Sequence, residues 1–461
     1  MKKTLWPLWI AVATFAALSL SSSLRAQNIT NAAGVWNIIN FTTPSRLTLE
    51  MDAQGVVTGI PEAGNFDRST GSLTVQTDGT FSGAVPDPIS GSAALGAPGE
   101  LILNLDGTNG PPSLTFNVNQ SADVITTAGS LADGYQDLIL GLRAPGTLAT
   151  NDLTGQWNIS SFQTPYQLDL EFDSSNKLIN VQGLDGFQTG TGNMTVNADG
   201  TFSGSAGNPM SGTVDGVGNG TVSVTVMTAE ETNTFTLFIN ASKDLMAVVS
   251  AAHDAYDNFQ ELLLFTKVSS NVPPAALAAD WRITTYDAPQ LTLLKNGSGQ
   301  VIGMDGLDGF GTQRQALFAG YDGFFIGLSG LPATGTFSGS TDGLVTASVQ
   351  TPDGAESIGF QLAGSGNAMV SSRTAGWGQE LLLATRSWPI PLGYREYGLN
   401  VARATNSATL EWVAATTNTA LQVSTDLTNW TTVPETIGQH TYTTTVTNSL
   451  PQLFRVVQPV P

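Results

Sequence analysis

One type of segment occurs three times in this chain, and each copy opens with a Gly/Ala-x-Trp-x-Ile motif. The tryptophans Trp36, Trp157 and Trp281 are 121 and then 124 residues apart. Each copy closes with a Gln-Asp/Glu-Leu-Leu/Ile-Leu segment, and a basic residue follows it. This period is too long for one turn of a solenoid and fits a small domain. We therefore predict three tandem domains whose separate cores share few contacts.

Apolar and polar residues alternate in several stretches of each copy, as they do in half-buried β-strands. In the second copy, for example, Phe235, Leu237 and Ile239 lie on one face of such a pattern. Asp-Gly pairs, which favour tight hairpin turns, occur at 78–79, 199–200 and 322–323. We expect roughly eight to ten short strands per copy and no helix. Short connections favour antiparallel, up-and-down pairing, and closing the sheet hides its edges. The expected fold class is all-β, with three tandem barrels or barrel-like domains.

The composition fits strands joined by tight turns, because 50 residues are glycine and only 12% are charged. Prolines at 145, 273 and 274 lie in the spacers between copies. We place the three β-repeats at residues 27–145, 146–270 and 271–388. Residues 392–461 differ from the repeats and predict a small C-terminal β-sandwich.

The C-terminal segment contains a strand-like stretch, then Ser-Thr-Asp-Leu-Thr-Asn-Trp at 424–430, then Leu-Phe-Arg-Val-Val at 453–457. It resembles C-terminal β-modules of secreted proteins from environmental bacteria. The resemblance covers only this part of the chain. It implies export and residence outside the cell or in the bacterial envelope, and it implies no catalytic activity.

Residues 1–26 have the order of a secretory signal peptide. Lys2 and Lys3 are followed by an apolar run over residues 8–20 and by small residues up to Ala26. The run is short for a transmembrane anchor, so we expect cleavage after Ala26 and no integral membrane segment in the processed protein. Cleavage removes three basic residues and no acidic one, which changes the net charge from −20 to −23.

The strongly acidic balance disfavours nucleic acid and anionic membranes as partners. Cysteine is absent, which excludes disulfides and thiolate metal sites. The two histidines, His253 and His440, belong to different modules, and no Gly-x-Ser-x-Gly or His-Glu-x-x-His motif is present. Asp-Gly pairs at 185–186, 305–306 and 308–309 are typical of turns rather than of calcium loops. We predict no enzyme, no metal and no cofactor.

The tryptophan and the closing basic residue of each copy are expected to meet, since the first and last strands of such a barrel are neighbours. A cation over an indole ring is a favourable contact. This Gly-x-Trp…Arg arrangement resembles the lipocalin and calycin signature, which would imply barrels that enclose an apolar ligand. Lys267 replaces the arginine in the second copy and Ala279 replaces the glycine in the third, so only the first copy has the full pattern. An analogous barrel with a filled core is the alternative. The predicted structural residues are Trp36, Arg143, Trp157, Lys267, Trp281 and Arg386.

Three function classes remain open. The leading interpretation is a secreted or cell-surface, non-enzymatic repeat protein with a structural or binding role and an unknown extracellular ligand or surface component. The second is a protein that binds a carbohydrate or a small apolar ligand. The third is a glycan-active enzyme, since the spacing of paired carboxylates is set in three dimensions. An internal apolar void, an exposed aromatic strip or two carboxyl groups across a cleft would discriminate between them.

Overall fold

The structure, a computed structural model, describes residues 29–97, 99–107, 113–130, 134–227, 232–253, 258–269, 272–328, 333–339, 342–351, 354–387, 399–403, 407–413, 419–424, 429–445 and 453–457. The predicted signal peptide lies outside these residues. Helical structure in the described part consists of short 3-10 helices.

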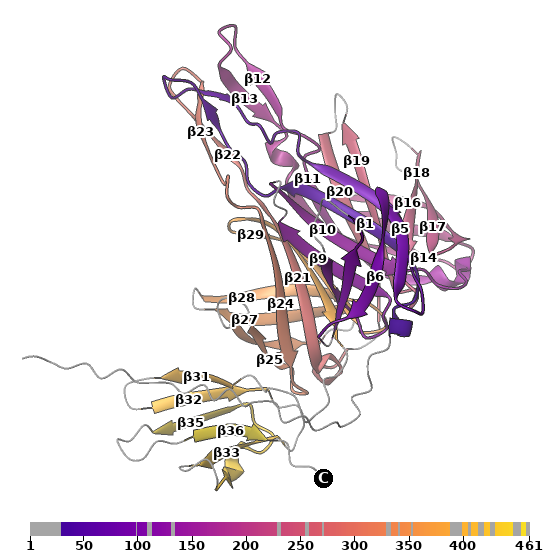
Figure 1. The fold of residues 1–461 in the computed structure, drawn as a ribbon, viewed down its shortest axis with the longest axis vertical. Helices are drawn as coiled ribbons and strands as arrows, with labels where there is room; N and C mark the ends of the chain where they lie inside the picture. Colours follow the sequence, from indigo (N-terminus) through magenta and orange to yellow (C-terminus); the bar gives the residue numbers. More distant parts are fainter. Residues whose placement is uncertain are drawn as a thin grey trace, which may run out of the picture.

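Each copy of the repeat folds into a closed barrel of eight antiparallel strands, as the strand patterns predicted (Figure 1). Barrel 1 contains β1 (Gly34–Pro44), β4 (Asp67–Val75), β5 (Thr80–Val85), β6 (Asp87–Leu95), β7 (Glu100–Leu105), β8 (Ser113–Val118), β9 (Val124–Ser130) and β10 (Tyr135–Arg143). Barrel 2 contains β11 (Gly155–Thr164), β14 (Gln188–Val196), β15 (Thr201–Ala206), β16 (Asn208–Gly218), β17 (Thr221–Met227), β18 (Thr232–Ile239), β19 (Leu245–His253) and β20 (Asn258–Lys267). Barrel 3 contains β21 (Ala279–Pro289), β24 (Gly311–Ala319), β25 (Phe324–Leu328), β26 (Ala333–Ser338), β27 (Leu344–Thr351), β28 (Gly354–Leu362), β29 (Ala368–Ala375) and β30 (Gly378–Arg386).

Sequence neighbours pair along each barrel, and the first strand closes it by pairing with the last. The Asp-Gly pairs form the expected turns. In barrel 1, the carboxylate of Asp78 accepts hydrogen bonds from the backbone N–H and the hydroxyl of Thr80, and Gly79 has a φ of 88°. A residue with a side chain is strained at that φ, which explains the glycine.

A two-stranded hairpin interrupts each barrel between its first and second strands. The hairpins are β2 (Glu50–Met51) with β3 (Val57–Gly59), β12 (Asp169–Phe172) with β13 (Leu178–Gln182), and β22 (Thr292–Lys295) with β23 (Val301–Asp305). The three hairpins contact one another and project from the barrels on one side (Figure 1). At their base, the rings of Phe66, Phe187 and Phe310 lie 6.0–6.5 Å apart between centroids.

The tryptophan of each repeat closes one end of its barrel. Trp36, Trp157 and Trp281 are fully buried. Each indole N–H donates to a backbone carbonyl four residues earlier, at Ala32, Leu153 and Leu277. These carbonyls lie at the ends of short 3-10 helices or just after them, namely η1 (Ile29–Asn31), η2 (Thr150–Leu153) and η4 (Pro274–Leu277). A satisfied N–H lets the large ring remain in the core without a desolvation penalty.

The three barrels also share a fourth core, which lies between their outer walls. It contains Phe41, Phe162 and Tyr286, one from the first strand of each barrel. The three ring centroids are 5.7–6.1 Å apart, and each pair meets edge to face. Each barrel has its own core, as expected, but the expectation that the copies share few contacts is wrong. The outer faces of the closing strands carry leucines of the same core, and these faces need the neighbouring barrels to cover them. The leucines are Leu138, Leu140 and Leu142 in β10, Leu262 and Leu264 in β20, and Leu381 and Leu383 in β30.

Polar contacts join the barrels in a closed ring at the turn between the sixth and seventh barrel strands. The participating groups belong to Asn119–Asp123 and to the corresponding turns of the other two repeats. The ring consists of Ser242 N donating to Asp123 Oδ2 (2.8 Å), Ser365 N donating to Asp244 Oδ2 (2.5 Å), and Asn367 Nδ2 donating to Ser121 Oγ (2.5 Å). Each barrel thus contacts both others, and the three form one body with approximate three-fold symmetry.

The C-terminal module consists of two three-stranded sheets, in agreement with the predicted sandwich. One sheet contains β31 (Leu399–Arg403), β32 (Ser407–Trp412) and β35 (Thr441–Thr445), and the other contains β34 (Thr431–Thr432), β33 (Ala420–Ser424) and β36 (Leu453–Val457). Leu410, Trp412 and Leu421 form the core between them. The module contacts barrel 3 through His440, whose ring stacks on Phe324 at 4.3 Å.

The shared core predicts that the barrels unfold together. Phe162→Ala removes a fully buried ring and should cost about 3–5 kcal/mol. Because the ring contacts barrels 1 and 3, calorimetry should show one lowered transition for all three barrels. Phe172→Ala, on the exposed part of a hairpin in the same repeat, should shift stability by no more than about 0.5 kcal/mol. Separate transitions, of which only one responds to Phe162→Ala, would contradict the shared core.

Candidate functional site

The six predicted structural residues lie in pairs at the closed ends of the barrels. Directly opposite each other on the first and last strands are Trp36 and Arg143, Trp157 and Lys267, and Trp281 and Arg386. The ammonium of Lys267 is 5.6 Å from the centroid of the Trp157 ring. All three basic side chains also donate to backbone carbonyls near the 3-10 helices, at Asn31, Asp152 and Ala278. This geometry ties the 3-10 helix at the closed end of each barrel to the closing strand.

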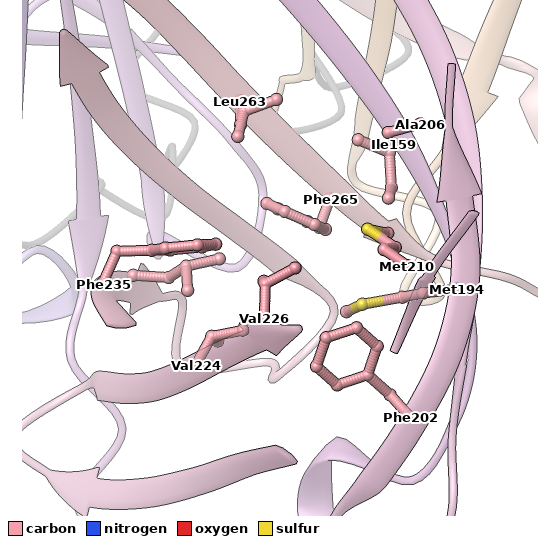
Figure 2. A pocket seen from close by; sticks show the side chains of 11 residues that line it. Ile159, Met194, Phe202, Ala206, Met210, Val224, Val226, Phe235, Leu263 and Phe265 are labelled. Carbon is pink, nitrogen blue, oxygen red and sulfur yellow. The ribbon is translucent and has the colours of Figure 1, made fainter. Parts of the chain in front are cut away.

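The interiors of barrels 2 and 3 contain cavities of different size. The cavity in barrel 2 has a volume of about 60 Å³, and side chains such as Met194, Met210 and Phe202 crowd it (Figure 2). The cavity in barrel 3 has a volume of about 140 Å³. Small residues line part of it, including Gly327, Ala333 and Ala347. Because these residues have little or no side chain, the interior of barrel 3 has a larger cavity than that of barrel 2.

The two residues of the Gln-Asp/Glu pair in the closing strand point to opposite faces of the barrel wall, because side chains alternate along a strand. They therefore make different contacts. The glutamine points outward and binds another barrel. Gln136 Nε2 donates to the backbone carbonyl of Asp287 (3.0 Å), and Gln260 Nε2 donates to that of Thr42 (3.0 Å). The acidic residue points to the barrel interior, near the end opposite the tryptophan.

In barrels 1 and 2 this acidic residue has a hydroxyl partner. Asp137 accepts a hydrogen bond from Thr42 Oγ1 at 2.5 Å. Glu261 accepts one from Ser161, and burial raises the pKa of its carboxyl to about 7. These groups are satisfied within their own barrels.

Barrel 3 has two acidic residues in the corresponding place. Asp287 on β21 is directly opposite Glu380 on β30, and Glu380 lines the cavity. Arg373 on β29 bonds to Glu380 and forms an ion pair with Glu356 at 3.1 Å. Asp287 is only 8% exposed, and its Oδ1 has no hydrogen-bond partner. Burial, together with the charge of Glu380, raises the pKa of the Asp287 carboxyl to about 8.

Strand alternation places Asp287 on the inward face of β21, next to the residues that line this cavity. Ile283 and Thr285 line the cavity, and Asp287 is the next residue on the same face of β21. Tyr286 and Ala288, on the opposite face, belong to the shared core between the barrels. We define the barrel-3 site as this cavity with Asp287, Glu380 and Arg373.

The residues of the barrel-3 site were not predicted from the sequence. The acidic position of the closing segment was a visible signal, but it occurs in all three copies. The specific signal is Asp287, where the other copies have Thr42 and Gln163 in the corresponding strand position. Carboxyl groups on the first and last strands of one barrel become neighbours only through closure.

His440 does not belong to this site. His440 bonds to Asp322 at 2.8 Å at the contact between the C-terminal module and barrel 3, and the side chain of His253 lies outside the described residues. Within the described ranges, no group of three or more histidine or acidic side chains is arranged to hold a metal ion. The helices described are too short to cross a membrane.

The buried carboxyl of Asp287 predicts a pH-dependent stability change. Its folded-state pKa of about 8 lies above the ordinary aspartate value of 3.8, so ionisation opposes folding as the pH rises from about 4 to about 8. Asp287→Asn should raise the free energy of unfolding at pH 7 by on the order of 1–4 kcal/mol. Urea unfolding should show this gain disappear near pH 3, where the aspartic acid is protonated in both states.

The exposed Asp308 offers a matched control for this measurement. Asp308→Asn makes the same chemical change in the same repeat and should leave the free energy of unfolding nearly unchanged at both pH values. If Asp287→Asn lowered the free energy of unfolding equally at pH 7 and pH 3, burial of the Asp287 carboxyl would not cost the wild type any stability.

Comparison with known proteins gives no family. No protein-family model and no curated protein sequence matches the chain. Among solved structures, a Transferrin Binding Protein B double mutant from Haemophilus parasuis Hp5 aligns with 8% identity and a TM-score of 0.26, covering 77% of this chain and 76% of that chain. The protein from serogroup B Neisseria meningitidis aligns with 9% identity and a TM-score of 0.19, with the same coverage. These scores are too low to transfer any property of those proteins.

Proposed function

We propose that this chain is an exported, non-enzymatic binding protein, in which barrel 3 holds a small ligand and barrels 1 and 2 provide its scaffold. The observation that carries this proposal is the cavity of about 140 Å³ in barrel 3 with polar groups at one end. Export is supported by the basic, apolar and small-residue order of residues 1–26. Its place of action is then outside the cell or in the envelope.

The volume of the cavity limits the ligand. A cavity of about 150 Å³ lined by leucine, isoleucine and phenylalanine accepts benzene in another protein, whereas drug-sized ligands need about 300 Å³ or more. The barrel-3 cavity therefore fits a compact body of about six non-hydrogen atoms. Its apolar lining includes Leu317, Phe325 and Phe360, which supports a hydrocarbon body.

Barrel 3 is held rigidly by its neighbours, which favours binding because little conformational freedom is lost. Tyr286, the residue before Asp287, is fully buried in the shared core. Gln136 of barrel 1 also binds the backbone of Asp287. This arrangement favours a pocket whose shape does not change when the ligand binds.

The other function classes have less support. Carbohydrate binding favours a strip of exposed aromatic rings, but the exposed Phe172 and Trp377 belong to different parts of the fold, a hairpin strand and the β29–β30 turn. A glycosidase needs two carboxyl groups that flank the substrate. Asp287 and Glu380 instead lie side by side on adjacent strands of one wall.

Filling the cavity should abolish binding without unfolding the barrel. A Cβ atom on Gly327 would have no neighbour closer than 3.7 Å, so Gly327→Leu fits within the cavity it lines. We expect n-butanol, used as a compact probe, to raise the Tm of the mature protein and to give a saturable heat in titration calorimetry. Gly327→Leu should lose both effects.

Gly359→Leu is the matched control, because Gly359 lies on β28 of the same barrel, is exposed, and has open space around its Cβ position. This variant should bind n-butanol like the wild type. Binding of n-butanol that survives Gly327→Leu would overturn the proposed function.

A further inference from the structure

We propose that the barrel-3 site selects a small organic cation, namely an ammonium group on a compact hydrocarbon body, with the charge placed against Asp287 and Glu380. This inference rests on the proposed function and names the ligand class of that same site. It follows from three features of the site: an unpartnered buried carboxyl oxygen, an excess of acidic groups, and an apolar cavity next to both.

The unpartnered oxygen is the first feature. Buried polar atoms are almost always hydrogen-bonded, and a native exception requires an explanation. Asp287 Oδ1 is such an exception. In the other two barrels, the hydroxyls of Thr42 and Ser161 supply a hydrogen-bond partner to the acidic residue of the closing strand. An ammonium donates up to three hydrogen bonds and accepts none, so it complements a carboxyl that can only accept when ionised.

The charge balance is the second feature. Asp287, Glu380 and Glu356 are three acidic groups, and Arg373 is the basic group among them. Arg373 already binds Glu380 and Glu356, so it does not compensate Asp287 by a hydrogen bond. The neighbouring arginines point away from the interior: Arg314 binds Asn117 of barrel 1, and Arg282 lies near Gly99 of barrel 1.

The apolar cavity is the third feature, and it sets the shape of the cation. Ile283, Leu317 and Leu382 line the interior below Glu380. A metal ion or a free ammonium ion would leave this surface uncovered. An alkylammonium buries its hydrocarbon chain there, which contributes about 0.8 kcal/mol per CH₂ group.

Binding of such a cation should release a proton. The pKa of about 8 keeps Asp287 mostly protonated at neutral pH in the free protein. A positive charge within hydrogen-bond reach favours the ionised carboxyl and lowers this pKa. Alkylammonium groups, like lysine, stay protonated to about pH 10, so affinity should rise between pH 6 and pH 9.

The test compares n-butylammonium with n-butanol, which have the same number of non-hydrogen atoms. At pH 9 and low salt, titration calorimetry of the mature protein should show about tenfold tighter binding of n-butylammonium. At pH 6 this preference should shrink, and titrations in two buffers at pH 7 should report close to one released proton. Asp287→Asn should lose the preference and the proton release but still bind n-butanol, whereas Asp308→Asn should behave like the wild type.

The outcomes separate this inference from the proposed function. If the wild type binds both probes equally at pH 9, or if Asp287→Asn keeps the preference, the cation assignment is wrong while the binding function stands. If the wild type binds neither probe, both proposals fail.

Discussion

The edge-to-face contact of Phe41, Phe162 and Tyr286 determines how the rest of the molecule is arranged. A closed barrel satisfies its own backbone hydrogen bonds and needs no neighbour for them. These barrels need neighbours for a different reason, since the outer faces of their closing strands are rows of leucines and each first strand adds one outward aromatic ring. Burying those faces against one another brings three barrels around one axis and also brings the three hairpins together on one side.

One of the three rings differs from the others, and this difference links the framework to the site. The hydroxyl of Tyr286 is fully buried and bonds to Thr43 (2.8 Å) and to the backbone carbonyl of Gln136 (3.2 Å), both in barrel 1. Gln136 in turn donates to the backbone of Asp287. Barrel 1 therefore fixes the strand from which Asp287 points into barrel 3. The approximate symmetry is broken where the site lies.

Local patterns determine much of this fold, which is why the sequence predicts it well. Period-two alternation and Asp-Gly turns specify strands and hairpins without reference to distant residues, and they led to three all-β, up-and-down units. The shared core depends on contacts between copies, for which no local pattern exists. Phe41 and Phe162 look like ordinary core residues of their own repeats until the barrels are placed side by side.

The barrel-3 site was harder to predict for a similar reason. The closing Gln-Asp/Glu segment was recognised as a repeat, but only the strand geometry assigns its glutamine to the interface and its acidic residue to the interior. The cavity arises from small residues such as Gly327 on β25, opposite Leu317 on β24. A glycine within a strand is a weak signal, because it equally marks a bulge or a close backbone approach.

Native-state hydrogen exchange of the full mature chain tests most directly whether the three barrels are one cooperative unit. The slowest amides of β1, β11 and β21 should exchange with the same opening free energy, and that value should fall equally in all three strands as denaturant is added. Opening free energies that differ from barrel to barrel by several kcal/mol, each with its own denaturant dependence, would contradict the account.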